Sequence, residues 1–375
     1  MSGMYVANEI PQLVTGFPQS LWPEWINNYT YADMQGMMEP HLHVAPLGAI
    51  AAYVLMVVLL PRLLSACYAK GDVEVPLFDK ATGEKKMDKK TGKQRVKIKR
   101  ASPIPEGLMK KIMFLWNGAL CAMSICIVLG CLPPYVDYIR HYGWFSTAAK
   151  QGTLCDTNRV LMRNGSMNFW GTVFVLSKYV ELGDTLLLIL KRSDVKVLQW
   201  WHHTTVLAFT WYAAYFELSC AWVFICFNAV VHSIMYYYFA MTMGFGWRFW
   251  WAKYLTHLQI VQMVVGIATV CSWSYQHFVQ GFPCRLQHPE PVMICCFIMY
   301  GSYLVLFVQF FIAKYCTAKA AGATVAKAVQ NAACGVDSKD LCGNDVGDDD
   351  EGEDPRLAAA AAAKKGSKKG KKKNL

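Results

Sequence analysis

The sequence predicts an all-α integral membrane protein with seven transmembrane helices. Of its 375 residues 54% are hydrophobic and only 17% are charged, and the mean hydropathy is +0.22. A soluble chain of this length would carry more charge. The apolar residues also occur in blocks of about 20, the length that a helix needs to cross a bilayer core. Together these observations favour a multi-pass membrane protein.

The apolar blocks follow a polar and aromatic N-terminal segment, residues 1–46, which lacks the basic start and continuous apolar run of a cleaved signal peptide. We expect the blocks at residues 47–66, 112–132, 168–190, 197–216, 218–243, 256–274 and 292–314. Only Glu217 separates the fourth block from the fifth, which predicts a tight antiparallel hairpin. The helical domain therefore covers residues 47–315, and the low-complexity tail 316–375 is expected to be disordered.

Loop charges predict the orientation. Residues 62–111 hold 14 Lys and Arg against 6 Asp and Glu, so this first connection, with its basic loop at 67–111, is expected in the cytosol. The N-terminus is then lumenal, and seven crossings make the C-terminus cytosolic. The net charge of +11 reflects such loops and the tail, so it does not indicate nucleic-acid binding. Lysines 372 and 373 resemble the dilysine retrieval signal of endoplasmic-reticulum membrane proteins, and a tail that binds lipid headgroups is the alternative.

Four residues on the predicted lumenal side are candidates for covalent modification. Asn28 and Asn164 begin glycosylation sequons. Cys155 and Cys284 are the best disulfide candidates. Most of the other cysteines lie inside apolar blocks, where they are expected to pack as small residues.

Polar and ionisable residues inside the apolar blocks point to a functional site, because such groups are costly in a membrane. They form four clusters, on the third, fourth, fifth and sixth blocks. The clusters contain Lys178, Glu181, Asp184 and Thr185; Gln199, His202 and His203; Asn228, His232 and Tyr236; and Thr256, Gln259 and Gln262. A spacing of three to four places the members of the first, third and fourth clusters on one helix face each. Purely structural ion pairs and interhelical hydrogen bonds are the alternative reading.

Imidazoles can both transfer protons and attack a carbonyl near neutral pH, so we expect acyl chemistry inside an apolar tunnel. The basic residues between the third and fourth blocks, Lys191, Arg192 and Lys196, predict a cytosolic mouth that suits an anionic carrier such as coenzyme A.

The same residues resemble the motifs of the ELO family of very-long-chain fatty acid elongases, which are membrane 3-ketoacyl-CoA synthases. Residues 178–185 fit the KxxExxDT box, residues 228–236 the NxxxHxxMY box, and residues 256–262 the TxxQxxQ box. The resemblance runs from about residue 47 to residue 315. One position departs: the histidine box, usually HxxHH, begins here with Gln199, which cannot titrate.

The resemblance implies condensation of a long-chain acyl-CoA with the co-substrate malonyl-CoA, the first and rate-setting step of microsomal elongation. The products are a 3-oxoacyl-CoA, CO2 and CoA. Our hypothesis makes His202 the nucleophile, His232 the partner acid and base, and His203 a supporting group. Asn228 and Gln199 orient imidazoles or bind an enolate oxygen. Substrate and CoA contacts are assigned to Lys178, Glu181, Asp184, Thr185, Gln199, Tyr236, Gln259 and Gln262.

Residues 174–185 and 301–307 are similar to family members that extend saturated and monounsaturated chains, whereas glutamine at position 199 also occurs in members that act on polyunsaturated chains. We favour the former and leave the latter open. No bound cofactor or metal is expected. The resemblance implies membrane lipid as a further partner. It leaves open association with the ketoacyl reductase, dehydratase and enoyl reductase of the cycle, and a homodimer.

Two other classes stay open at this point. A membrane di-iron desaturase or hydroxylase also uses histidine boxes, but it needs about eight clustered imidazoles, and this chain has nine histidines of which five lie in predicted lumenal segments or at their edge. A seven-helix receptor or transporter would share the topology, but it does not predict the four polar clusters.

Overall fold

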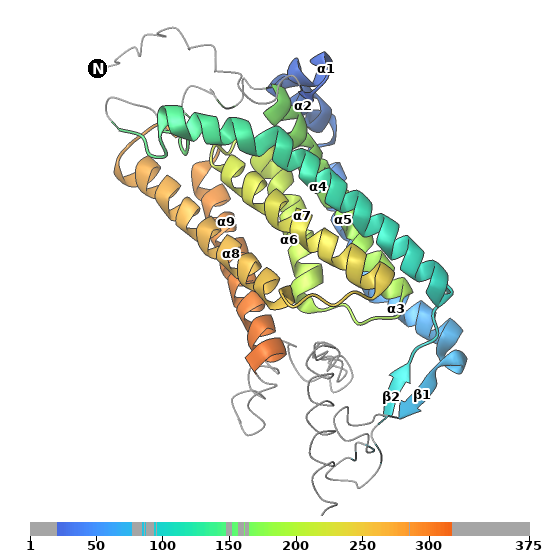
Figure 1. Ribbon diagram of the computed structural model, residues 1–375. Coiled ribbons are helices and arrows are strands. Elements are labelled where there is room, and N and C mark those ends of the chain that lie inside the picture. Colours follow the sequence, from blue (N-terminus) through green and yellow to red (C-terminus); the bar gives the residue numbers. More distant parts are fainter. Residues whose placement is uncertain are drawn as a thin grey trace, which may run out of the picture.

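The computed structural model describes residues 21–76, 85, 87, 94, 96–147, 152–156, 161, 165–284 and 286–316. This part of the chain is mostly helical (Figure 1). Its long helices are α3 (Val44–Tyr68), α4 (Glu106–Tyr142), α5 (Gly165–Leu190), α6 (Val197–Tyr215), α7 (Ala221–Phe245), α8 (Ala252–Ser274) and α9 (Pro289–Phe311). Each predicted apolar block coincides with one of these helices. The predicted tail from residue 317 onward lies outside the described residues.

Five of the long helices are long and apolar enough to cross a membrane: α3, α4, α7, α8 and α9. This confirms a multi-pass membrane protein. The other two, α5 and α6, are not among these five spans, and they are the helices that carry Lys178, Glu181, Asp184 and the adjacent histidines. Seven crossings therefore stay a prediction. The polar residues that suggested a site also lower the hydropathy of the helices that carry them.

Six long helices pack as a closed ring. Around it, α4 contacts α7, α7 contacts α8, α8 contacts α9, α9 contacts α6, α6 contacts α5, and α5 returns to α4. Helix α3 lies outside the ring against α5 and α6, and most of its surface is exposed. Side chains from five of these helices, α5 to α9, line the interior of the ring.

Small residues bring the helices close together. A Cβ at Gly130 of α4 would overlap the Trp170 ring of α5, and a Cβ at Gly266 of α8 would overlap the Tyr300 ring of α9. Such pairs are typical of helix packing in membranes, where van der Waals contact replaces the hydrophobic effect as the main attraction.

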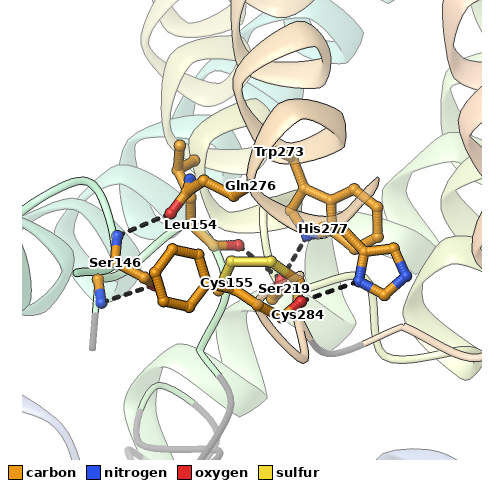
Figure 2. The surroundings of a disulfide bond; sticks show 10 residues. Ser146, Leu154, Cys155, Ser219, Trp273, Gln276, His277 and Cys284 are labelled. Atoms are coloured by element: carbon orange, nitrogen blue, oxygen red, sulfur yellow. Dashed lines mark hydrogen bonds between the residues drawn. A yellow bond between two sulfur atoms is a disulfide. The ribbon is translucent and has the colours of Figure 1, made fainter. Parts of the chain in front are cut away.

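At one end of the bundle, which we call the disulfide end, three connections between helices are held together. The connection between α4 and α5 is linked to the segment before α9 by a Cys155–Cys284 disulfide, the pair named from the sequence (Figure 2). Ser219, in the turn between α6 and α7, donates a hydrogen bond to the Leu154 carbonyl at 2.6 Å and accepts one from the Trp273 indole at 3.0 Å. The cysteines at positions 67, 121, 126, 131, 220, 226, 271, 295 and 296 are free.

The turn at the disulfide end between α6 and α7 is as tight as the sequence predicted. Helix α6 ends at Tyr215 and α7 begins at Ala221. Glu217 adopts the left-handed region with φ of 61°, which reverses the chain within a few residues.

Two short helices also lie at the disulfide end, α1 (Glu24–Asn27) and α2 (Tyr31–Met38) (Figure 1). The apolar pattern of residues 1–46 does not predict them. Thr30 and Asp33 form a reciprocal capping box at the start of α2. Asn28, the first sequon residue, is exposed between the two helices, whereas Asn164 lies outside the described residues.

The opposite end, which we call the hairpin end, carries an antiparallel pair of strands, β1 (Val73–Pro76) and β2 (Val96–Lys99), between α3 and α4. Val73 pairs with Lys99 and Pro76 with Val96. The predicted basic loop thus contains a strand pair that its charge pattern does not predict.

Charged contacts fasten the base of this hairpin to the connection between α5 and α6. Arg100 lies 2.6 Å from an Asp194 carboxylate oxygen, and Arg192 lies 3.5 Å from Asp72. The Ser102 hydroxyl donates a 2.8 Å hydrogen bond to the Leu190 carbonyl. The hairpin end is therefore held by ion pairs, and the disulfide end by a covalent bond and backbone hydrogen bonds.

Candidate functional site

A cavity lies inside the ring of helices. Polar side chains from four helices border it: His202 of α6, Asn228 of α7, Gln262 of α8 and Tyr303 of α9. The remaining walls of the cavity are mainly apolar. They are formed by Phe174 and Val175 of α5, Val206, Phe209 and Ala213 of α6, Trp222, Phe224 and Ile225 of α7, Met263 of α8, and Met299 and Tyr300 of α9. At the disulfide end the lining includes Tyr31, Met34, Glu217 and Leu218.

A buried ion pair lies between α5 and α7 beside the cavity. The Lys178 ammonium lies 2.7 Å from Glu181 Oε1 and donates a hydrogen bond of 3.2 Å to Asn228 Oδ1. It also lies 4.2 Å from the centre of the Phe174 ring. Both charged residues are 2% exposed, so neither charge is solvated by water. A charge this deep is tolerated only where an opposite charge and hydrogen bonds compensate for its lost hydration.

Glu181 connects this ion pair to a histidine. Its Oε1 accepts a hydrogen bond from Ser177 at 3.1 Å and lies 3.7 Å from His232 Nδ1 on α7. Its second oxygen, Oε2, is buried and has no hydrogen-bond partner in the part of the chain that the structure describes. One carboxylate therefore holds the lysine and faces the histidine that we expected to act as acid and base.

Asp184 lies one turn nearer the hairpin end and joins two further helices. Its Oδ1 accepts a hydrogen bond from the Trp116 indole of α4 at 2.6 Å, and its Oδ2 accepts one from the Tyr236 hydroxyl of α7 at 2.9 Å. A Cβ at Gly183 would overlap the Trp116 ring. The absence of a side chain at position 183 thus allows Trp116 to reach the neighbouring carboxylate.

Thr185 joins α5 to α3 and α6. Its hydroxyl lies 2.9 Å from the Tyr53 hydroxyl and accepts a hydrogen bond from the Gln199 amide at 3.2 Å. Gln199 is not among the described residues that line the cavity. In this structure the glutamine that replaces the first histidine of the box contacts a threonine, an interaction that needs no titrating group.

The histidines occupy different surroundings. His202 lines the cavity, and its ring centre lies 4.9 Å from that of Tyr303. His203 points to α3, with its ring 6.2 Å from that of Tyr53, and its buried Nδ1 has no hydrogen-bond partner among the described residues. The ring centres of His202 and His203 lie 5.4 Å apart, with the ring planes at 88° to each other. The two adjacent histidines thus diverge, as their helical spacing predicts, and only His202 faces the cavity.

The two glutamines of the sixth block also differ. Gln262 is buried and lines the cavity. Gln259 donates a hydrogen bond to the Met235 sulfur at 3.4 Å and is not part of the described cavity wall. Thr256 is buried one turn nearer the hairpin end.

Three aromatic residues of the site were missed by sequence reasoning. Trp116 and Tyr53 hold the third-block polar residues, as described above. The Tyr303 hydroxyl bonds to the Thr205 hydroxyl and donates a hydrogen bond of 3.2 Å to the His202 carbonyl. Each lies far along the chain from the residue that it contacts, inside an otherwise apolar helix, so no local spacing marks it.

The described residues contain no group of three or more His, Cys, Asp or Glu side chains that could hold a metal ion. The expected lack of a cofactor stays a prediction. Within this part of the chain, the ligand cluster that a di-iron centre needs is not present.

The fold and the site define a helical, multi-pass membrane protein with a polar cluster above an apolar cavity. The ELO family model, described as the GNS1/SUR4 family, matches residues 41–323. The chain belongs to this family.

Individual relatives agree with the family match. The chain is 34% identical to "Fatty acid elongase 2" of Trypanosoma cruzi over 219 residues, which cover 57% of this chain and 76% of the relative. It is 33% identical to "Very long chain fatty acid elongase 6" of Drosophila melanogaster over 213 residues, 56% of this chain and 65% of the relative. It is 36% identical to "Fatty acid elongase 1" of Trypanosoma cruzi over 208 residues, 54% of this chain and 68% of the relative.

Proposed function

We propose that this protein is a fatty acid elongase that condenses a long-chain acyl-CoA with malonyl-CoA to give a 3-oxoacyl-CoA, CO2 and CoA. The observation that carries the proposal is the position of His202, whose imidazole borders a largely apolar cavity beside a buried polar cluster. The cavity suits an acyl chain, and the imidazole suits acyl transfer. The names of the relatives support the same reaction class.

In the first step, a ring nitrogen of His202 attacks the thioester carbonyl carbon. The carbon–sulfur bond breaks, and the CoA thiolate leaves and takes up a proton. The product of this step is an acyl-imidazole, which is reactive enough to pass on its acyl group. His232 serves as the partner acid and base, because Glu181 lies 3.7 Å from its Nδ1 and stabilises the protonated ring.

In the second step, the carbon–carbon bond to the malonyl carboxylate breaks and CO2 leaves. The resulting enolate attacks the acyl-imidazole carbonyl, which forms the new carbon–carbon bond and releases His202. Asn228 supports this step. Its oxygen accepts from Lys178, so its amide nitrogen is the group left to donate toward an oxyanion in the cavity.

The remaining polar residues position these groups. Lys178 fixes Asn228 and balances the Glu181 charge. Trp116 and Tyr236 hold Asp184, and Tyr53 and Gln199 hold Thr185, toward the hairpin end where we place the CoA arm. We assign saturated and monounsaturated long chains as the favoured substrates, with polyunsaturated chains as the alternative.

We further propose that all seven long helices cross the endoplasmic-reticulum membrane, with the N-terminus lumenal and the C-terminus cytosolic. The hairpin end is then cytosolic, in line with its excess of Lys and Arg. The disulfide end is then lumenal, in line with an oxidising compartment. The reductase, the dehydratase and the enoyl reductase that complete an elongation cycle are the proposed functional partners.

The test is a condensation assay on the full chain in membranes that lack background elongation. Labelled malonyl-CoA is supplied with acyl-CoAs of graded length and unsaturation, and products are identified by mass. A product two carbons longer, as a 3-oxoacyl-CoA, is the expected result. No extension of any acyl-CoA by folded, membrane-inserted protein would refute the proposed reaction.

A further inference from the structure

We propose that helix α2 forms the far wall of the cavity and that Tyr31 and Met34 limit the length of the acyl chain that it holds. The inference rests on the proposed function for the identity of the ligand. Both residues line the cavity and both are buried, at 9% and 7% exposure. They come from a segment before residue 41, where the family match begins. The limit to chain length would therefore be set by a part of this chain outside the family domain.

Helix α2 is fixed where it meets the end of α6. The Tyr31 hydroxyl donates hydrogen bonds to the Ala214 carbonyl at 2.8 Å and to the Tyr215 carbonyl at 3.0 Å. These carbonyls belong to the last turn of α6, where Ala214 also accepts a hydrogen bond from the Glu217 backbone amide at 3.3 Å. Met34 and Trp211 pack in the same apolar cluster, and the Trp211 indole donates to the Leu42 carbonyl at 3.0 Å. The wall is thus attached to the cavity at several points.

The preceding helix α1 is also tightly seated. A Cβ at Gly165, the first residue of α5, would overlap the carbonyl oxygen of Asn27. Because the backbones of α1 and α5 touch at this point, α1 cannot move closer to α5. The segment that precedes α2 is therefore packed directly against α5, which restricts how α2 can shift to make room for a larger side chain.

The distance from His202 to this wall suits a long acyl chain. His202 and Ala214 both line the cavity on α6, twelve residues apart. At 1.5 Å per residue this separation is about 18 Å. An extended chain with carbon–carbon bonds of about 1.5 Å advances roughly 1.25 Å per carbon. The cavity therefore accommodates about 14 carbons between the reacting carbonyl and α2, and each added pair of carbons needs about 2.5 Å more.

The experiment changes the size of Met34 in the full chain. Met34→Ala and Tyr31→Leu enlarge the far end, whereas Met34→Trp fills it. The matched control is Ala32→Trp, which adds a comparable bulk to an exposed position of the same helix. Condensation rates and equilibrium binding are measured for acyl-CoAs from 12 to 22 carbons. The binding measurement does not require turnover.

Met34→Trp is expected to lower both the relative rate and the relative affinity for the longest accepted chains by about 10-fold or more, since one misplaced methylene is worth about 1 to 3 kcal/mol. Met34→Ala and Tyr31→Leu are expected to move the upper limit up by about two carbons. Ala32→Trp is expected to keep the wild-type profile.

The outcomes separate the two proposals. If the wild-type protein condenses acyl-CoAs but the Met34 variants keep its length profile, the wall assignment is wrong. If binding shifts with Met34 while no variant condenses any substrate, the wall assignment stands and the proposed reaction fails. If Ala32→Trp shifts the profile as much as Met34→Trp, the effect arises from general disturbance of α2, which also overturns the assignment.

Discussion

The polar cluster inside the ring and the disulfide end both bury hydrogen-bonding groups, but they use them differently. At the disulfide end, the Ser219 hydroxyl and a disulfide connect loops through backbone and covalent bonds. In the polar cluster, Glu181 Oε2 and His203 Nδ1 are buried without hydrogen-bond partners in the described part of the chain. Unpaired buried polar atoms are costly and rare in native structures. Gln276 Nε2 at the disulfide end is also buried without a partner among the described residues, so unpaired atoms alone do not distinguish the two regions. The difference is that the disulfide end joins connections, whereas the polar cluster buries charged and titratable side chains that face one another inside the ring.

The largest expected effect is a fall in the condensation rate with little change in thermal stability. His202→Ala should lower condensation by about three orders of magnitude or more, because the variant lacks the proposed nucleophile. The structure gives the His202 side chain no hydrogen bond within the described residues, so thermal stability in detergent should change little. Product formation per folded protein is measured beside the unfolding midpoint, with the exposed His257→Ala as control. A normal rate at equal expression would rule out the nucleophile.

The next prediction concerns the buried ion pair. Lys178→Met leaves the Glu181 carboxylate without its compensating charge and should destabilise the protein by about 3 to 5 kcal/mol. The double variant Lys178→Met with Glu181→Gln removes both charges and should recover most of that stability but not the activity. Unfolding midpoints of the single and double variants in detergent provide the measurement. Equal stability of the two would mean that the charges are not coupled.

At the disulfide end, we expect a substitution to lower stability without lowering the condensation rate. Cys155→Ser with Cys284→Ser should cost about 2 to 5 kcal/mol, because the bond closes a long loop between residues 129 apart. The condensation rate per folded molecule should stay close to wild type, since the bond lies away from His202. Thermal inactivation is compared with initial rate at low temperature. A large fall in the initial rate at full folding would show that this end also controls the site.

The smallest effect is expected at the start of α2. Hydrogen bonds from the Thr30 hydroxyl and backbone lower the pKa of Asp33 below its ordinary value. Because the folded pKa is the lower one, the capping interaction stabilises α2 above about pH 4 and is lost as the pH falls through the folded pKa. Asp33→Asn should remove this acid sensitivity. Hydrogen exchange of α2 amides, corrected for intrinsic rates, provides the measurement, and an unchanged pH dependence in Asp33→Asn would contradict the assignment.

The features that were predicted best from sequence are those that depend on a single helix. The apolar blocks predicted the long helices to within a few residues, except at α4, which begins at Glu106 and ends at Tyr142, well beyond the predicted 112–132. Helical spacing also predicted that Lys178 and Glu181 share a face, and the structure pairs them at 2.7 Å. The short N-terminal helices and the strand pair were missed, since neither has a long periodic pattern.

The sequence by itself determined the membrane class, the family motifs and the polar residues of the candidate site, because composition and helical periodicity are local properties of the chain. Only the tertiary structure decided which of these residues face the cavity. It brings Trp116, Tyr53 and Tyr303 to the site, separates His202 from His203, and directs Gln259 to Met235 and Gln262 to the cavity. These outcomes depend on how six helices close into a ring, and helix spacing says nothing about which neighbour each face will meet.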